Sequence, residues 1–539
     1  MREPHRTGAP RDPRDPAVRR RWRAAAALAL AGALVDACGS SDDAPVRTND
    51  AGTDGAADVS ASDASADATA EADAKGAAPD DRFATGRRLV PRTATLEGLT
   101  TDGFVAFSEP SASGGRAAKV IALDGTGETS ITEGTGSDKA VLIQALGRDV
   151  FVWTNRGNRT ATLTVWSKAT GVLSKGTGIR PGRAAATPDG AFIGFIQNVT
   201  AASADIVVGP IDGSQATVIG TLNATDDTCW RNVDLGFVGA AAPRFVSRYC
   251  PGTATAFVLR STTPAGGGSV DLSTSATDAT FGKEIVALRE ASGTLKTSAP
   301  DGTGAVVIAS NATAYALSRD ESMVAYQTTD DAILASPARA ASPRVVVPAG
   351  RAKRLGAIAR DNQHLLYASV LGDAGPNALD TPTDVLLAAL DGGAPVSLVA
   401  TPTSCPDCLA DSFTLDSSYA LVIDPIDDSV DAGGSGPLRA FGLDAGAAMT
   451  FGKSVWTTLA LDGGGGAASR LLVVEIGRTP ALETGYAYTL TTRALSPSDA
   501  PVVLARGAER VAVDATRTTT LYSIPGAGDV AGIWIAPLD

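Results

Sequence analysis

Short apolar segments alternate with polar turns along most of this chain, from about Leu96 to the last residue. In the first of two patterns, a turn containing aspartate leads into an apolar segment that often ends in an aromatic residue. The instances are TTDGFVAF (Asp102), TPDGAFIGF (Asp189), SRDESMVAY (Asp320), ARDNQHLLY (Asp361), TLDSSYALV (Asp416) and AVDATRTTTLY (Asp514). Asp-Gly turns favour tight chain reversal because glycine accepts positive φ, so the pattern predicts antiparallel hairpins.

The second pattern follows at a similar offset, where another apolar segment runs into a turn with aspartate. Its instances are VIALDGTGE (Asp124), IVVGPIDGS (Asp212), LKTSAPDGTG (Asp301), VLLAALDGG (Asp391), LRAFGLDAG (Asp444) and IWIAPLD (Asp539). Weaker copies of the first pattern lie between the clear ones, at LGRDVFVW (Asp149), PRFVSRY (Arg244), GKEIVAL (Lys283) and SRLLVVEI (Arg470). Together the copies give about ten units with a period of roughly 45 residues.

This period indicates the fold class. Several short strands in each unit, with no long amphipathic helix between them, are typical of small antiparallel sheets repeated around an axis. A helical solenoid would show a period of about 3.6 residues, and a parallel β-helix would need shorter repeats. We therefore expect an all-β chain that forms a β-propeller of four-stranded antiparallel blades. About ten repeat units are counted, and seven or eight blades are the usual alternative.

The unit of Asp-Gly turn, apolar strand, second strand and Leu-Asp-Gly turn resembles the propeller repeats of the TolB family, over roughly Arg82 to Asp539. The resemblance implies that each unit is one blade and that the partners are proteins of the cell envelope. The last unit, IWIAPLD, lacks an outer strand. We expect the run Arg87 to Leu96 to supply that strand and to close the ring, which removes exposed sheet edges.

The N-terminus carries an export signal. Arg19 to Arg23 form a basic cluster, and the twelve apolar residues Ala24 to Val35 are too few to span a bilayer but suit a signal peptide. The following residues resemble the lipobox of bacterial lipoproteins: Val35 and Ala37 match it, and Asp36 departs from it. The resemblance implies that residues 1–37 are removed and that Cys38 is lipidated, the alternative being an ordinary signal peptide. Gly39 in the position after the cysteine favours the outer membrane.

Residues 38–81 are expected to be the lipidated Cys38 followed by an acidic tether. Between Gly39 and Asp81 the chain has eleven acidic residues and two basic ones, among Ala, Ser, Gly and Thr. Such a segment has too little apolar surface to offset the entropy of ordering, and charge repulsion extends it. We interpret it as a spacer between the membrane and a domain at 82–539. A calcium-binding tract is the alternative.

The remaining cysteines are even in number, which suggests disulfides in an exported protein. We predict two local pairs, Cys229 with Cys250 and Cys405 with Cys408. The alternatives are a redox-active pair at Cys405-Pro-Asp-Cys408 and a zinc site built from all four cysteines.

The composition narrows the function classes. The net charge of -13 disfavours a nucleic-acid partner. Only two histidines exist, His5 in the expected signal peptide and His364, so a multi-histidine zinc site cannot form. A Ser-His-Asp mechanism would depend on His364 alone, and no G-x-S-x-G motif occurs. The acidic run from Asp424 to Asp431 lacks EF-hand spacing, so we interpret it as a solvated insertion rather than a calcium site.

We predict no catalytic, cofactor-binding or metal-binding residues. The expected function is that of a lipid-anchored protein of the cell envelope, with the outer membrane favoured, whose propeller binds or scaffolds a protein or other ligand. The alternative is a propeller enzyme, a hydrolase or lyase acting on sugars in the axial funnel. Fold alone does not distinguish the two, because propellers present different sites on the same frame. Funnel-lining acids around a metal would favour catalysis, and a shallow apolar or mixed rim would favour a protein partner.

Overall fold

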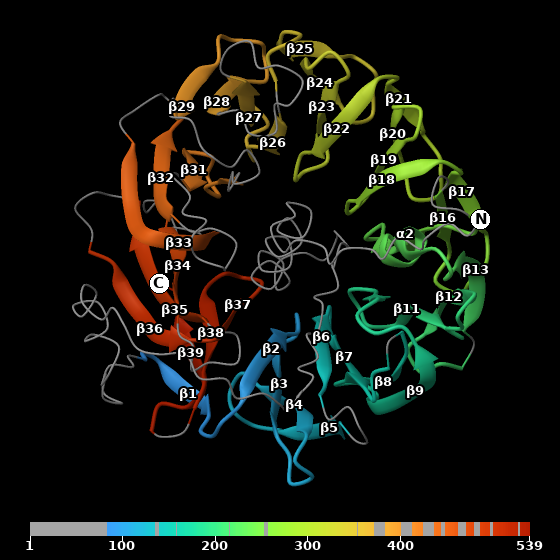
Figure 1. Cartoon of the computed structure of the whole chain (residues 1–539), viewed down its shortest axis with the longest axis vertical. Helices are drawn as coiled ribbons and strands as arrows, with labels where there is room; N and C mark the ends of the chain where they lie inside the picture. Colours follow the sequence, from blue (N-terminus) through green and yellow to red (C-terminus); the bar gives the residue numbers. More distant parts are fainter. Residues whose placement is uncertain are drawn as a thin grey trace, which may run out of the picture.

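The computed structural model describes residues 84–538, apart from 135–139, 158, 215, 253–256, 353, 371–382, 400–411, 424–435, 444–447, 462–469, 479–485, 496–499 and 527–528. Within this part of the chain the strands form eight four-stranded sheets and one seven-stranded sheet, all antiparallel between neighbours. Figure 1 shows these sheets standing side by side around a central axis. The predicted all-β propeller is therefore confirmed.

Blades 1 to 5 follow one another along the chain, each made of four consecutive strands. Blade 1 consists of β2 (Thr95–Leu99), β3 (Phe104–Pro110), β4 (Arg116–Ala122) and β5 (Thr129–Glu133). Blade 2 consists of β6 (Leu142–Leu146), β7 (Asp149–Thr154), β8 (Ala161–Ser167) and β9 (Gly171–Ile179). Blade 3 consists of β10 (Ala184–Ala186), β11 (Phe192–Gln197), β12 (Ser203–Pro210) and β13 (Thr217–Asn223). Blade 4 consists of β14 (Asp234–Val238), β15 (Arg244–Tyr249), β16 (Val258–Thr262) and β17 (Val270–Ser273). Blade 5 consists of β18 (Ala276–Phe281), β19 (Val286–Glu290), β20 (Leu295–Ser298) and β21 (Val306–Ala309).

Blades 6 and 7 repeat this arrangement, and two further blades share one strand. Blade 6 consists of β22 (Ala312–Leu317), β23 (Met323–Thr328), β24 (Ile333–Pro337) and β25 (Arg344–Val347). Blade 7 consists of β26 (Arg354–Ile358), β27 (His364–Val370), β28 (Thr383–Ala389) and β29 (Val396–Val399). The seven-stranded sheet consists of β30 (Ser412–Phe413), β31 (Tyr419–Ile423), β32 (Gly436–Gly442), β33 (Met449–Leu461), β34 (Arg470–Arg478), β35 (Tyr486–Ala494) and β36 (Val502–Ala508). Its first half is blade 8 and its second half is blade 9, because β33 pairs with β32 up to Val455 and with β34 from Val455 onward.

Blade 10 joins the two ends of the described chain. Its strand order is β37 (Arg510–Val513), β38 (Thr519–Ile524), β39 (Gly532–Pro537) and then β1 (Arg87–Val90). The N-terminal segment thus supplies the outer strand, as predicted, but only Arg87–Val90 does so, since Leu96 belongs to the inner strand of blade 1. The described strands form a ring of ten blades, because the seven-stranded sheet counts as two. This matches the number of counted repeats rather than the usual seven or eight.

The core is distributed over the blade interfaces. Ten clusters of buried apolar side chains, within the described residues, each lie between two neighbouring blades. One of them holds the ring closed, since Leu89 and Val90 of blade 10 pack with Leu96 and Phe107 of blade 1. The interfaces are tight: a Cβ added at Gly194 in blade 3 would come 2.1 Å from the Phe245 ring of blade 4. Each blade therefore depends on both neighbours for the burial of its faces.

The aspartates of the first sequence pattern sit in a repeated turn between the first and second strands of a blade. In blade 3 the Thr187 hydroxyl donates to Asp189 at 2.6 Å and accepts from the Phe192 backbone N–H at 3.0 Å. The residue after the aspartate has positive φ, 71° at Gly190. The same bonds recur at Thr100 with Asp102, Ser318 with Asp320 and Thr414 with Asp416. This network explains why Thr or Ser stands two residues before the aspartate in these four turns.

The aspartates of the second pattern lie in the turn between the third and fourth strands. Asp124 accepts hydrogen bonds from the backbone N–H and the hydroxyl of Thr126, which lower the pKa of its carboxyl group. Asp212 and Asp301 are held in the same way. In a four-stranded antiparallel blade both kinds of turn emerge on the same side of the ring. We call this side the Asp face. The opposite side, which carries the turns between the second and third strands and the connections between blades, is the loop face.

Candidate binding surface on the loop face

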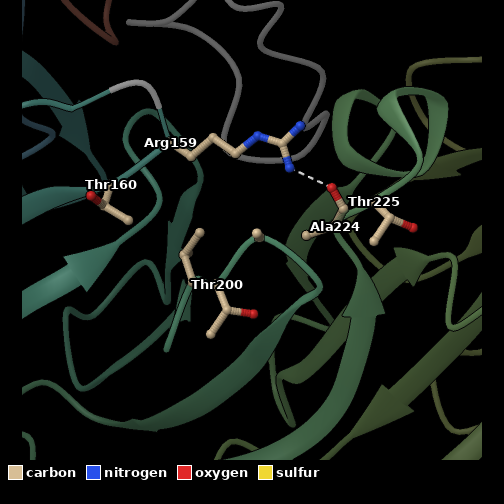
Figure 2. A pocket seen from close by; sticks show the side chains of 7 residues that line it. Arg159, Thr160, Thr200, Ala224 and Thr225 are labelled. Carbon is tan, nitrogen blue, oxygen red and sulfur yellow. Dashed lines mark hydrogen bonds between the residues drawn. The ribbon is translucent and has the colours of Figure 1, made fainter.

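A groove of about 620 Å³ opens on the loop face over blades 2 and 3. Arg159 and Thr160, from the β7–β8 loop, form one side, and the β11–β12 loop forms the floor with Val199, Thr200 and Ala201. The third side is the segment after β13, with Ala224 and Thr225. Figure 2 shows Arg159 reaching across the groove toward Ala224, with Thr200 beneath it. The lining is mixed, with one guanidinium, three hydroxyl groups and small apolar side chains.

The wall of this groove continues into a short helix, α2 (Asp227–Arg231), in the connection from blade 3 to blade 4. The helix begins where the Asp226 carboxylate accepts hydrogen bonds from the backbone N–H groups of Thr228 and Cys229. This N-cap satisfies donors that have no partner within the helix. The buried Trp230 then anchors the helix in the cluster between blades 3 and 4.

Arg159 is held at the edge of the groove by three contacts. Its Nη1 donates to the Ala224 carbonyl oxygen, and its Nη2 lies 3.5 Å from an Asp227 carboxylate oxygen. The guanidinium also lies over the Trp230 ring, 5.2 Å from the centroid. Its side chain is still 34% exposed, so the cation faces solvent while its orientation is fixed.

Further arginines lie beneath and beside α2. Arg180 is 1% exposed, and its guanidinium carbon lies 4.2 Å from the Trp230 ring centroid. Arg183, also buried, donates from Nη2 to the Arg231 carbonyl oxygen at 3.1 Å. Arg231 itself is half exposed and pairs with Asp227 at 2.8 Å. Such stacking of guanidinium groups on an indole ring is favourable in itself, and it places several cations close together.

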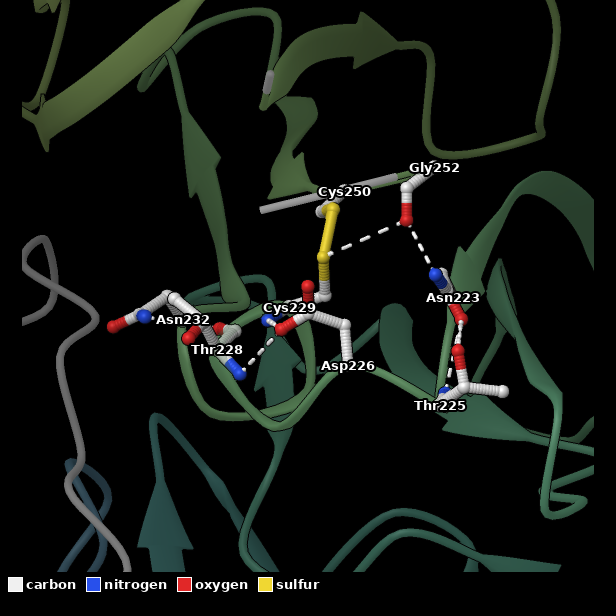
Figure 3. Close-up of a disulfide and its surroundings, with 8 residues drawn as sticks. All are labelled: Asn223, Thr225, Asp226, Thr228, Cys229, Asn232, Cys250 and Gly252. Atoms are coloured by element: carbon white, nitrogen blue, oxygen red, sulfur yellow. Dashed lines mark hydrogen bonds between the residues drawn. A yellow bond between two sulfur atoms is a disulfide. The ribbon is translucent and has the colours of Figure 1, made fainter. Parts of the chain in front are cut away.

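A disulfide joins α2 to blade 4. Cys229 in the helix is bonded to Cys250, which follows β15, and their Cα atoms lie 5.2 Å apart. Figure 3 shows this bond beside Asn223, whose backbone N–H donates to the Cys250 carbonyl oxygen at 2.8 Å. The Asn223 side chain donates to Gly252. The first predicted cysteine pair is thus present in the structure, and it fixes one wall of the groove.

Removal of this bond should lower stability measurably. A Cys229→Ala/Cys250→Ala variant should lose about 3 kcal/mol of unfolding free energy, because the bond closes a loop of 21 residues in the unfolded chain. For a domain of this size that corresponds to a decrease of only roughly 3 °C in Tm. Differential scanning calorimetry of the oxidised protein and the variant would measure it. An unchanged Tm would show that the bond does not stabilise the fold by constraining the unfolded chain.

Other candidates from the sequence lie elsewhere or outside the described residues. Cys38, Cys405 and Cys408 are not among the described residues, so lipidation and the second pair stay predictions. The run from Asp424 to Asp431 also lies outside them. His364 begins β27 on the Asp face, where its Nδ1 lies 2.9 Å from an Asp361 carboxylate oxygen. It takes no part in the groove.

The described residues form neither a metal-binding cluster nor a membrane-spanning helix. No three histidine, cysteine, aspartate or glutamate side chains gather closely enough there to hold a metal ion. None of the helices in that part of the chain has the length and apolarity to cross a bilayer.

The Asp face holds one unusual carboxyl group. Asp149, the first residue of β7, is fully buried, and neither of its carboxylate oxygens has a hydrogen-bond partner. Burial raises the pKa of Asp149 to about 7, and the nearby carboxylates of Asp102 and Asp189 contribute to the increase. Arg148 and Lys175 oppose it.

Lys175, on β9, has a buried amino group with no hydrogen-bond partner. Its amino group borders a small cavity of about 160 Å³ next to Gly213. Burial lowers the pKa of Lys175, although the charges of Asp212 and Asp149 oppose the decrease. The Asp149 carboxyl group and the Lys175 amino group thus lie buried without hydrogen-bond partners at the junction of blades 2 and 3.

The sequence identified Cys229 but not the groove beside it. The signal for α2 was present as Asp226-Asp227-Thr228, an N-cap followed by an acid in the first turn. The groove itself had no local signal, because Arg159 and Ala224 are 65 residues apart in the chain. Only the packing of successive blades brings them together.

Comparison with known proteins shows likeness in fold alone. The chain matches no protein-family model and no curated protein. Among solved structures it is similar to the tricorn protease (12% identity, 82% of this chain and 47% of that chain, TM-score 0.34). It is similar to an oligogalacturonate lyase from Vibrio parahaemolyticus (11%, 85% and 96%, TM-score 0.32) and to TolB from Acinetobacter baumannii (12%, 57% and 66%, TM-score 0.22). The chain spans about half the length of the tricorn protease. The ten-bladed topology rests on this chain's own strand order.

Proposed function

We propose that this chain is a lipid-anchored protein of the cell envelope whose propeller binds a protein partner through the loop-face groove, without catalysis. The observation that carries the proposal is the groove itself. It is open and shallow with a mixed lining, and a disulfide and a capped helix hold its wall. A surface that is fixed before binding loses little entropy when a partner docks, and such preorganisation favours affinity.

The anchor determines where this surface operates. We propose that diacylglycerol on Cys38 holds the protein at a membrane, with the outer membrane favoured. The acidic segment up to Asp81 would separate the propeller from the lipid headgroups. A flexible chain of that length spans roughly 35–40 Å, and repulsion among its acids lengthens it. The propeller can then meet a partner in the envelope while it stays concentrated near the membrane.

A photo-crosslinking experiment in intact cells tests both parts. A photoreactive amino acid at Ala201, exposed in the groove, should give a discrete adduct with a protein partner. The same group at Ser342, exposed in the β24–β25 turn on the Asp face, should not. In a Cys38→Ser background the adduct at Ala201 should decrease strongly, because the protein is no longer held at the membrane.

The controls distinguish the two claims. Intact-mass analysis of the purified protein should find a lipidated N-terminus at Cys38 in the parent and none in the Cys38→Ser variant. A mature N-terminus elsewhere without lipid would refute the anchor. Equal adducts from Ala201 and Ser342, or none from Ala201, would refute the groove as the binding surface.

A further inference from the structure

We infer that the loop-face groove receives an acidic segment of a polypeptide partner, with Arg159 as the group that binds its carboxylates. This inference rests on the proposed function and adds the chemistry of the partner. It depends on three features of the groove: its local charge, the unused donors of Arg159 and the small apolar side chains beside it.

The groove is a basic region on an acidic protein. Arg159 and Arg231 lie at the groove edge, where they share the carboxylate of Asp227, and Arg180 and Arg183 lie beneath α2. The chain as a whole carries a net charge of -13. A cluster of the opposite sign to the rest of the molecule attracts acidic partners to one place and repels them elsewhere.

Asp227 does not neutralise both Arg159 and Arg231, because the two guanidinium groups share its one carboxylate. Its carboxylate lies 2.8 Å from Arg231 and 3.5 Å from Arg159. The shorter contact joins residues four apart in α2 and would persist if Arg159 took another partner. An incoming carboxylate can therefore replace Asp227 at Arg159 without moving the helix.

Arg159 also has the donors that a carboxylate needs. A guanidinium carries five N–H donors in a planar fork that fits a carboxylate through two parallel hydrogen bonds. The Ala224 carbonyl oxygen takes one donor, and Asp227 is beyond normal hydrogen-bond distance. The Arg159 guanidinium lies over the Trp230 ring, and this contact limits its rotation. The Thr200 and Thr225 hydroxyls are occupied within their own loops, by Ser203 and Asn223, and Arg159 is the charged group of the groove lining.

The rest of the lining favours a polypeptide over a bare anion. Val199, Ala201 and Ala224 border the guanidinium with small apolar surfaces. A chain in which small residues alternate with acids would place its carboxylates on Arg159 and its methyl groups against this wall. An exposed charge pair alone contributes little, so the apolar contacts are needed for useful affinity.

Binding of a defined probe to the full-length mature protein tests the inference. A fluorescent peptide of alternating Asp and Ala should bind, as measured by anisotropy, and a matched peptide of Asn and Ala should not. Arg159→Gln should weaken binding roughly tenfold, the loss expected for one charge-assisted bidentate contact. Arg344→Gln, which removes an exposed arginine on β25 of blade 6, changes the net charge equally and should leave binding unchanged.

A second variant moves affinity in the opposite direction. Asp227→Asn removes the competing carboxylate and should strengthen binding several-fold, an effect that misfolding cannot imitate. Equal binding of the two peptides, or equal losses in Arg159→Gln and Arg344→Gln, would overturn the inference. So would binding to vesicles of anionic lipid that depends on Arg159 when the Asp peptide does not bind. If the Ala201 adduct in cells survives Arg159→Gln, the proposed function stands and the acidic partner does not.

Discussion

A chain that begins at Arg92 should lose most of its cooperative thermal transition, whereas one that begins at Arg82 should melt like the mature protein. The chain from Arg92 lacks both the tether and β1, whereas the chain from Arg82 lacks only the tether. In the ring, Leu89 and Val90 are 5% and 0% exposed, and β1 pairs with β39 at Arg87, Arg88 and Val90. Removal of this strand leaves β39 as a bare edge and uncovers apolar side chains of blades 1 and 10.

The expected loss is large relative to the stability of a whole domain. Burial of two aliphatic side chains stabilises by roughly 1.5–3 kcal/mol each, and each backbone hydrogen bond contributes roughly 1 kcal/mol. A total of about 6 kcal/mol compares with the 5–15 kcal/mol typical of folded domains. The buried Tyr522 adds to the closure, since its hydroxyl donates to the Thr85 carbonyl oxygen at 2.5 Å.

Calorimetry and limited proteolysis of the two truncated chains would measure this effect. A synthetic peptide of Arg82–Pro91, added in excess, should restore the transition of the chain that begins at Arg92, because the open edge of β39 is its template. Equal melting temperatures for both chains, without peptide, would show that the ring does not depend on closure by β1. The same conclusion would follow if the peptide had no effect on melting and the chain from Arg92 already gave a protease-resistant core.

The fold could be predicted because its signals are local. The Thr-x-Asp and Ser-x-Asp turns encode their own hydrogen bonds, as between Thr187 and Asp189, and they recur before the second strand of blades 1, 3, 6 and 8. Counting these turns together with the weaker copies of the strand pattern gave about ten units, with seven or eight blades as the alternative. The outer strand was predicted from the missing strand of the last unit, since a ring needs as many outer strands as inner ones.

The sequence misled where a blade departs from the pattern. In LGRDVFVW, Asp149 was grouped with the turn aspartates, but the turn there is Gly147-Arg148 and Asp149 already belongs to β7. Its place in the strand is that of Phe104 in blade 1 and Phe192 in blade 3. The long strand β33, shared by blades 8 and 9, was likewise invisible, because a continuous strand carries no turn signal at the boundary.

The groove could not be predicted, because it depends on distances between blades. Arg159 has no motif around it that marks a binding residue, and it gains its role only through Ala224, Asp227 and Trp230, which the ring brings to it. Local sequence patterns thus determined the blades, whereas packing between neighbouring blades determined the loop-face groove. The same packing produced the buried environment of Asp149.

Asp149→Asn should stabilise the protein at neutral and alkaline pH and change it little in acid. The carboxyl group is buried without a partner, so its ionised form is disfavoured by the loss of solvation. Its pKa is about 7 in the folded protein and 3.8 in the unfolded chain. That difference corresponds to about 4 kcal/mol of unfolding free energy, which the parent protein loses when Asp149 ionises. A neutral asparagine at this position avoids the loss.

The direction with pH follows from proton binding. Between about pH 4 and pH 7 the folded state holds the Asp149 proton while the unfolded state releases it, so the stability of the parent protein decreases as the pH rises. Below that window both states are protonated, and above it both are ionised. The advantage of the asparagine variant should therefore grow from near zero at about pH 4 to its full value above about pH 7.

Denaturant unfolding of parent and variant at several pH values would measure this advantage directly. Asp102→Asn is the matched control: it keeps Asp149 but removes a neighbouring carboxylate that raises its pKa. In that variant the pH dependence should persist with its midpoint moved to lower pH, because less repulsion opposes ionisation of Asp149. An advantage of Asp149→Asn that stays constant across this range would mean that the side chain ionises freely in the folded ring, and that the junction of blades 2 and 3 admits water.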